Sequence, residues 1–96
     1  MAVTKARGTV YATQTQIPRS EVKRFSGSME KKLRETDYRG EIWRDCDIET
    51  LVDGLAEKVA TLKKEVAIGW GVSEAAADVA NHAMMISDWW ECNVGP

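Results

Sequence analysis

Residues 47–69 read DIETLVDGLAEKVATLKKEVAIG, and this stretch decides the fold. Large apolar side chains recur along it at every third or fourth position, which places them on one face of an α-helix of about five turns. Asp47 is suited to cap the start of this helix, and Gly69 interrupts the pattern at its end. The apolar face consists of Ile48, Leu51, Val52, Leu55, Val59, Leu62 and Val66.

A second helix is predicted before this stretch. Pro18 and Ser20 are residue types typical of a helix start. A stripe with helical spacing follows and ends before the turn-prone residues 37–40. The stripe comprises Val22, Phe25, Met29 and Leu33.

A third helix is predicted after it. Ser73 can cap a helix that runs from Glu74 to about Trp90. The short join that contains Gly69 and Gly71 forces this helix to run antiparallel to the long one. Its expected inward-facing residues are Ala76, Val79, Ala80, Ala83, Met84 and Ile86.

These patterns predict an all-α fold, an antiparallel bundle of three main helices. Three apolar stripes leave one side of a four-helix arrangement open, so a second copy of the chain is expected to complete it. The core of this homodimer is expected to include Leu55, Val59 and Leu62. Residues 18–96 form the single predicted domain. Residues 1–17 are expected to be a mobile or partner-ordered arm, since a short strand over 9–13 would lack a partner.

Composition narrows the classes of function. The chain has 96 residues, enough for one small domain. Thirteen Lys and Arg against fifteen Asp and Glu give a net charge of −2, which favours neither nucleic acid nor an anionic membrane. No apolar run approaches the ~20 residues of a membrane span, and the start lacks a signal-peptide pattern. We therefore expect a cytoplasmic protein without a membrane partner or direct contact with nucleic acid.

The cysteines carry no recognisable motif. Cys46 and Cys92 lie far apart in the sequence, and His82 alone cannot complete a zinc site with them. Two reduced thiols are expected, with a disulfide between them as the alternative.

Several stretches resemble one known family. Residues 74–88 read EAAADVANHAMMISD, residues 29–35 read MEKKLRE, residues 38–43 read YRGEIW, and residues 51–55 read LVDGL. Over about residues 18–90 the chain resembles the MazG-like nucleotide pyrophosphohydrolases, especially small phage members. Their corresponding stretches run roughly E-A-A-D-V-A-N-F-A-M-M-I-A-D, and M-E-x-K-L followed by H-K-G-G-W.

The resemblance implies a metal site between the two long helices. In the family, E-x-x-E on one helix and E-x-x-D on the next bring four carboxylates together to hold Mg²⁺, which assists hydrolysis of a nucleoside triphosphate to monophosphate and pyrophosphate. In this chain the E-x-x-E falls on Lys58 and Thr61, and the E-x-x-D falls on Ala75 and Asp78. Three of the four carboxylates are therefore replaced, one of them by a cation.

Three interpretations of these replacements stay open. Neighbouring acids can form a shifted metal site, Lys58 can pair with Asp78 in place of a metal, or this face can simply be solvated. The shifted site would use Glu57, Glu65, Glu74 and Asp78.

The resemblance also suggests nucleotide-binding residues, namely Arg39, Trp43 and Asn81. Asn81 can equally make a hydrogen bond between helices. Trp43 can equally cover the core. His82 stands where the family commonly has Phe and is expected to be a packed or surface residue.

Two classes of function follow. We expect a non-catalytic protein of phage or mobile-element origin, in the cytoplasm of a bacterial host, that binds and inhibits a host factor as anti-CRISPR or other anti-defence proteins do. This interpretation needs no cofactor. The alternative is an active, Mg²⁺-dependent pyrophosphohydrolase with a rewired site. No Lys or Arg follows Lys64, and the expected partner-binding residues lie in this acidic third of the chain: Asp88, Trp89, Trp90 and Glu91.

Overall fold

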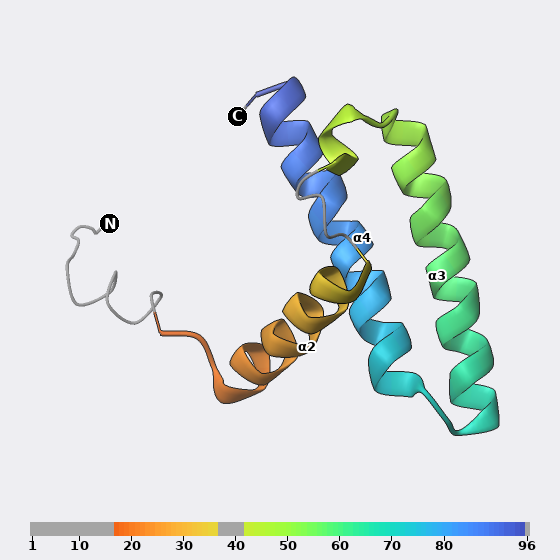
Figure 1. The fold of residues 1–96 in the computed structure, drawn as a ribbon. Helices are drawn as coiled ribbons and strands as arrows, with labels where there is room; N and C mark the ends of the chain where they lie inside the picture. The colour runs from red at the N-terminus through yellow and green to blue at the C-terminus, as the bar shows by residue number, and fades with distance from the viewer. Residues whose placement is uncertain (1–16, 37–41, 96) are drawn as a thin grey trace, which may run out of the picture.

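The computed structural model describes residues 17–36 and 42–95, and this part of the chain consists of helices joined by short turns (Figure 1). No strand is present in it, which confirms the predicted all-α class. Most of the predicted arm, with its short strand, and the predicted nucleotide-binding residue Arg39 lie outside the described residues. The elements in chain order are α2 (Ser20–Thr36), the 3-10 helix η1 (Ile42–Asp45), α3 (Ile48–Ile68) and α4 (Val72–Asn93).

Helices α3 and α4 form the predicted antiparallel hairpin. Gly69 ends α3 with φ of 83°, and its N–H donates to the Glu65 carbonyl at 2.7 Å. Gly71 has φ of 73° and precedes the first residue of α4. Two residues in the left-handed region, which favours glycine, turn the chain within three positions. Trp70 between them is 73% exposed.

Two predicted helix caps are wrong in detail. Asp47 does occupy the N-cap position of α3, but its side chain makes no capping hydrogen bond. Ser73 does not cap α4, because the left-handed Gly71 starts this helix earlier and places Ser73 in its first turn. Helix α4 also continues three residues beyond Trp90, to Asn93.

Helix α4 is the centre of the molecule. It packs along α3 on one side, and α2 and η1 also pack against it (Figure 1). In the part of the chain that the structure describes, the small buried core consists of Leu51 on α3 and of Ala75, Ala77 and Asn81 on α4.

The buried residues of α4 differ from those predicted to face inward, so this prediction is wrong. The buried residues of α4 are Ala75, Ala77 and Asn81, whereas Ala83 is exposed and the other five predicted residues are half-buried. The physical reason is that α4 is covered from two directions, by α3 and by α2, and these directions do not coincide with the face inferred from apolar spacing alone.

The other two stripes are also less buried than expected. In α2, Met29 and Leu33 are half-buried, but Val22 and Phe25 are exposed. In α3, only Leu51 of the seven stripe residues is fully buried. None of the helices in the described part of the chain has the length and apolarity to cross a bilayer.

Candidate functional site

One close contact shows which residues of α3 and α4 face each other. A Cβ atom added at Gly54 would lie 3.0 Å from the ring of His82. In an antiparallel pair, one helical turn further places Lys58 level with Asp78, and the next places Thr61 level with Ala75. These are the four positions at which the family resemblance expects metal ligands.

Asp78 faces a cation from a third helix. Its Oδ1 lies 3.7 Å from Nζ of Lys32 on α2, and both side chains are about three-quarters buried, with 26% and 22% of their surfaces exposed. The cation that the structure pairs with Asp78 is thus Lys32. Of the three interpretations left open, the one that pairs Lys58 with Asp78 is not seen among the described residues. Of the other positions, Ala75 is buried, Lys58 is half-buried and Thr61 is exposed.

The acids of the predicted shifted site point in different directions. Glu57 is exposed, and the Glu65 carboxylate lies over the hairpin turn, where its Oε1 would be 2.7 Å from a Cβ atom added at Gly71. Glu74 is exposed and lines a pocket between α2 and the start of α4. Within residues 17–36 and 42–95, no three His, Cys, Asp or Glu side chains lie close enough together to hold a metal ion.

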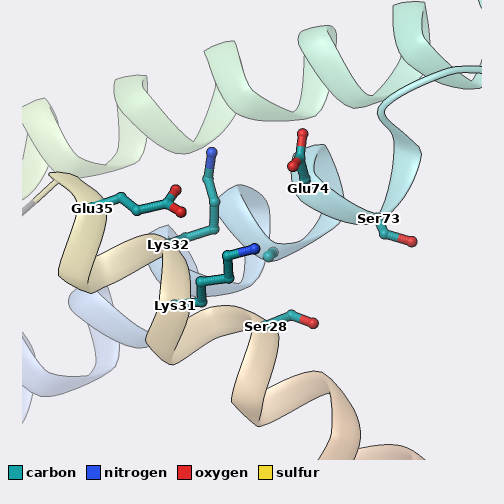
Figure 2. A pocket seen from close by; sticks show the side chains of 7 residues that line it. Ser28, Lys31, Lys32, Glu35, Ser73 and Glu74 are labelled. Atoms are coloured by element: carbon teal, nitrogen blue, oxygen red, sulfur yellow. The ribbon is translucent and has the colours of Figure 1, made fainter.

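A shallow pocket of about 100 Å³ lies between α2 and the start of α4. Figure 2 shows Lys31 and Lys32 reaching from α2 toward α4, with the carboxylates of Glu35 and Glu74 on either side. Because both signs of charge line this pocket, its electrostatics favour neither an anion nor a cation.

Asn81 connects two helices. It is only 3% exposed, and its Nδ2 donates to the Met29 carbonyl of α2 at 3.0 Å. Its Oδ1 is buried without a hydrogen-bond partner. Of the two roles considered from the sequence, the structure shows the interhelical hydrogen bond.

His82 is packed, as expected. Its Nδ1 lies 3.1 Å from the Asp78 carbonyl, one turn earlier on α4, and the other side of the ring rests against Gly54. A neutral ring that donates from Nδ1 leaves Nε2 as an acceptor on the α3 side.

Asp88 fastens η1 to the end of α4. Its Oδ2 accepts hydrogen bonds from the Trp43 indole at 2.9 Å and from Nε of Arg44 at 2.7 Å, and its Oδ1 accepts from Nη2 of Arg44 at 3.1 Å. The Arg44 hydrogen bond, followed by that of Trp43, lowers the pKa of the Asp88 carboxyl below its ordinary value of 3.8. We call this group of three residues the Asp88 clamp.

The neighbouring Trp89 and Trp90 differ in their contacts and exposure. The Trp89 indole donates to the Cys46 carbonyl at 2.7 Å. This hydrogen bond joins α4 to the segment directly after η1, next to the Asp88 clamp. Trp90 is 52% exposed, and Glu91 beside it is exposed as well. Of the four predicted partner-binding residues, Asp88 and Trp89 are thus engaged within the chain, whereas Trp90 and Glu91 face outward. Cys46 and Cys92 are both free thiols.

The sequence did not reveal the two cations that pair with Asp78 and Asp88, namely Lys32 and Arg44. Lys32 occupies the Lys position of the M-E-x-K-L stretch, so the resemblance pointed to it without giving it a role. Arg44 stands in a short segment without helical periodicity, where no pattern indicates that it contacts Asp88, 44 positions later.

No protein-family model, curated protein or solved structure matches this chain. The assignment of function consequently depends on the residues themselves.

Proposed function

We propose that this chain is a non-catalytic, MazG-like helical protein of phage or mobile-element origin that binds a host protein and inhibits it, as an anti-defence factor. The observation that carries the non-catalytic part is the ion pair between Asp78 and Lys32. Asp78 is the one carboxylate retained from the four that the family resemblance implies, and an ammonium group already neutralises it.

Electrostatics supports this interpretation. A divalent ion at Asp78 would have to displace Lys32 or share the site with it, and at about 4 Å the repulsion between them amounts to several kcal/mol at an effective dielectric constant near 20. Lys58 adds a second cation on the facing helix. A single carboxylate cannot offset these terms, because Mg²⁺ in proteins relies on several oxygen ligands.

The surface that we assign to the host protein is the outer side of the last turns of α4. Trp90 offers an exposed indole, a side chain enriched at the centres of protein interfaces, and Glu91 adds a negative charge next to it. Such a surface suits a partner with a basic patch, since complementary charges speed encounter and the indole anchors the complex.

The direct test of the non-catalytic part is an assay of pyrophosphate release. The purified protein, with Mg²⁺ or Mn²⁺ and each common nucleoside triphosphate, should release no more pyrophosphate than buffer does. Turnover that Asp78→Ala abolishes would overturn the proposal and favour a rewired enzyme.

A restored metal site tests the assignment of the four positions. Lys58→Glu, Thr61→Glu and Ala75→Glu, introduced together with Lys32→Met, should produce a protein whose melting temperature rises on addition of Mg²⁺, because a ligand that binds only the folded state stabilises it. The same variant carrying Asp78→Asn is the control and should respond less. A variant that folds but gives no response would show that these positions do not form a site.

Capture of a host protein tests the binding part. Trp90→Ala should reduce the amount of host protein recovered from a bacterial lysate on the immobilised chain. Trp70→Ala, which removes the other strongly exposed indole at the opposite end of α4, is the matched control and should leave recovery unchanged. Equal recovery with both variants would exclude the Trp90 surface.

A further inference from the structure

The pocket between α2 and the start of α4 is lined by charges that do not neutralise one another. Lys31 and Glu35 lie four positions apart on α2, and Glu74 lies in the first turn of α4. Within the described part of the chain, none of these three side chains makes an ion pair or a hydrogen bond. Lys32, the fourth charged residue of the lining, is paired with Asp78 at 3.7 Å. A cation and two carboxylates are thus available to a bound molecule.

The available charges of opposite sign lie apart. A Lys and a Glu four positions apart on a helix are close enough to form an ion pair, but the Lys31 side chain extends toward α4 instead. Figure 2 shows the Lys31 ammonium and the Ser28 hydroxyl on one side of the pocket, and the carboxylates of Glu35 and Glu74 on the other. A single molecule with a negative group and a positive group can therefore meet both sides at once.

The pocket has room for such a molecule. Its volume of about 100 Å³ is several times the ~10–15 Å³ that one water molecule needs. Ala77, which also lines it, is completely buried and ends at its Cβ atom, and Ser28 and Ser73 are short as well. These small side chains leave the space between the charged groups open.

We propose that this pocket binds a small zwitterion, a molecule in which a short chain joins one ammonium group to one carboxylate. Lys31 binds the carboxylate, with the Ser28 hydroxyl as a further donor. Glu35 and Glu74 bind the ammonium group. Amino acids with short side chains have this chemistry. The inference goes beyond the proposed function, because it concerns a small molecule and does not involve the Trp90 surface.

The same charges make the pocket selective. A simple anion that approaches Lys31 also approaches the carboxylates of Glu35 and Glu74, which repel it. A simple cation at the carboxylates is repelled by Lys31 in the same way. Only a molecule with both signs gains the attractive interactions without these penalties, so discrimination comes from repulsion as well as attraction.

A bound zwitterion would join α2 to α4. The structure already holds these helices together by the hydrogen bond from Asn81 to the Met29 carbonyl and by the Lys32–Asp78 ion pair. A ligand that bridges Lys31 on α2 and Glu74 on α4 adds a further link between them. Binding should therefore raise the melting temperature of the chain, because the pocket exists only when α2 is packed on α4.

An NMR titration of the intact, ¹⁵N-labelled chain tests the proposal. The probes are glycine, β-alanine and γ-aminobutyrate, which differ in the length between their charges, with acetate and methylammonium as singly charged controls at the same ionic strength. At least one zwitterion should shift the amide signals of residues 28–35 and 73–77, with a dissociation constant below about 10 mM. Acetate and methylammonium should bind at least about tenfold more weakly.

Two variants test the assigned roles. Lys31→Met, which keeps a similar helix propensity, should weaken binding of the zwitterion at least about tenfold. Lys63→Met is the matched control, since Lys63 is exposed on α3 outside the pocket, and it should bind as wild type does. Glu35→Gln combined with Glu74→Gln removes the repulsion of anions, so acetate should bind this variant at least as tightly as glycine does.

Three results would overturn the proposal. The first is the absence of binding by all three zwitterions at about 100 mM. The second is acetate or methylammonium binding as tightly as the best zwitterion, which would indicate a site for a simple ion. The third is equal affinity of wild type and Lys31→Met.

Discussion

Asp88 shows how one side chain can hold distant parts of a chain together. Its two oxygens receive three hydrogen bonds, from Trp43 and Arg44, so its ionised form is stabilised in the folded state and its pKa is lowered. The stabilisation is fully present above the unfolded pKa near 3.8 and is lost as the pH falls through the lower, folded value.

The pH dependence of unfolding follows from this. Between pH 7 and pH 5, the Asp88 contribution should be constant, and below about pH 4 it should decline. Asp88→Asn should lower the urea midpoint at pH 7 and should lose less stability than wild type between pH 4 and pH 2.5. Asp53→Asn is a suitable control, because Asp53 is exposed on α3 and its removal should leave the change of stability with pH as it is in wild type. If the free energy of unfolding fell with pH in the same way for wild type and Asp88→Asn, the stabilising role of the Asp88 clamp would be contradicted.

Asn81 gives a second prediction for a single residue. Asn81→Asp would place a buried carboxylate 3.0 Å from a carbonyl oxygen and should destabilise the protein by about 2–4 kcal/mol at pH 7. Part of this loss should be regained near pH 5, where a protonated carboxyl can donate to the Met29 carbonyl. Urea unfolding at pH 7 and at pH 5 measures this recovery of stability. Asn81→Ala, which cannot ionise, should show no such recovery.

The sequence predicted some of these residues and not others. A polar Asn among small residues on a helix indicates an interhelical hydrogen bond, and the structure has one. The partners of Asp78 and Asp88 could not be predicted, because Lys32 and Arg44 become their neighbours only through the placement of α2 and η1 on α4.

At the scale of helices, two glycines should respond in opposite ways to the same substitution. Gly27 lies inside α2 with open space around it, so Gly27→Ala should stabilise the protein by about 0.5–1 kcal/mol through helix propensity alone. Gly54 lies inside α3 against the His82 ring, whose Nδ1 is held by the Asp78 carbonyl. The free energy of unfolding of Gly54→Ala should therefore be at least about 1 kcal/mol lower than that of Gly27→Ala.

Thermal unfolding of the two variants beside wild type measures this difference. His82→Ala in the Gly54→Ala background removes the ring and should recover much of the loss. Equal melting temperatures for Gly27→Ala and Gly54→Ala would contradict the close approach of α3 and α4 at this level.

Helix positions were predictable because each is set by local signals, namely apolar spacing, a proline and serine at the start of α2, and Gly69 at the end of α3. How deeply each helix face is buried could not be predicted in the same way. Apolar spacing locates a stripe, but the neighbours of that stripe decide how much of it is covered, and α4 meets its neighbours on two sides.

For the whole molecule, the homodimer expected from the apolar stripes would make stability depend on protein concentration. If two chains unfold together, the melting temperature should rise by about 3 °C for each tenfold increase in protein concentration. Differential scanning calorimetry at three concentrations measures this shift. Val59→Glu, which places a charge in the expected core of the homodimer, should melt at a temperature that is independent of protein concentration. A wild-type chain that does the same would contradict the expected homodimer.

The Asp88 clamp has one more consequence, which concerns the order in which the chain opens. The hairpin is joined covalently at residues 69–71, whereas hydrogen bonds of Trp43, Arg44 and Trp89 tie its other end to the neighbouring segments without a covalent link. Fluctuations should therefore open the hairpin from the clamped end, while the turn end keeps both helices close. Loss of the clamp in Asp88→Asn would speed amide hydrogen exchange over residues 48–53 and 86–93 and leave residues 60–66 and 74–80 protected to the same extent.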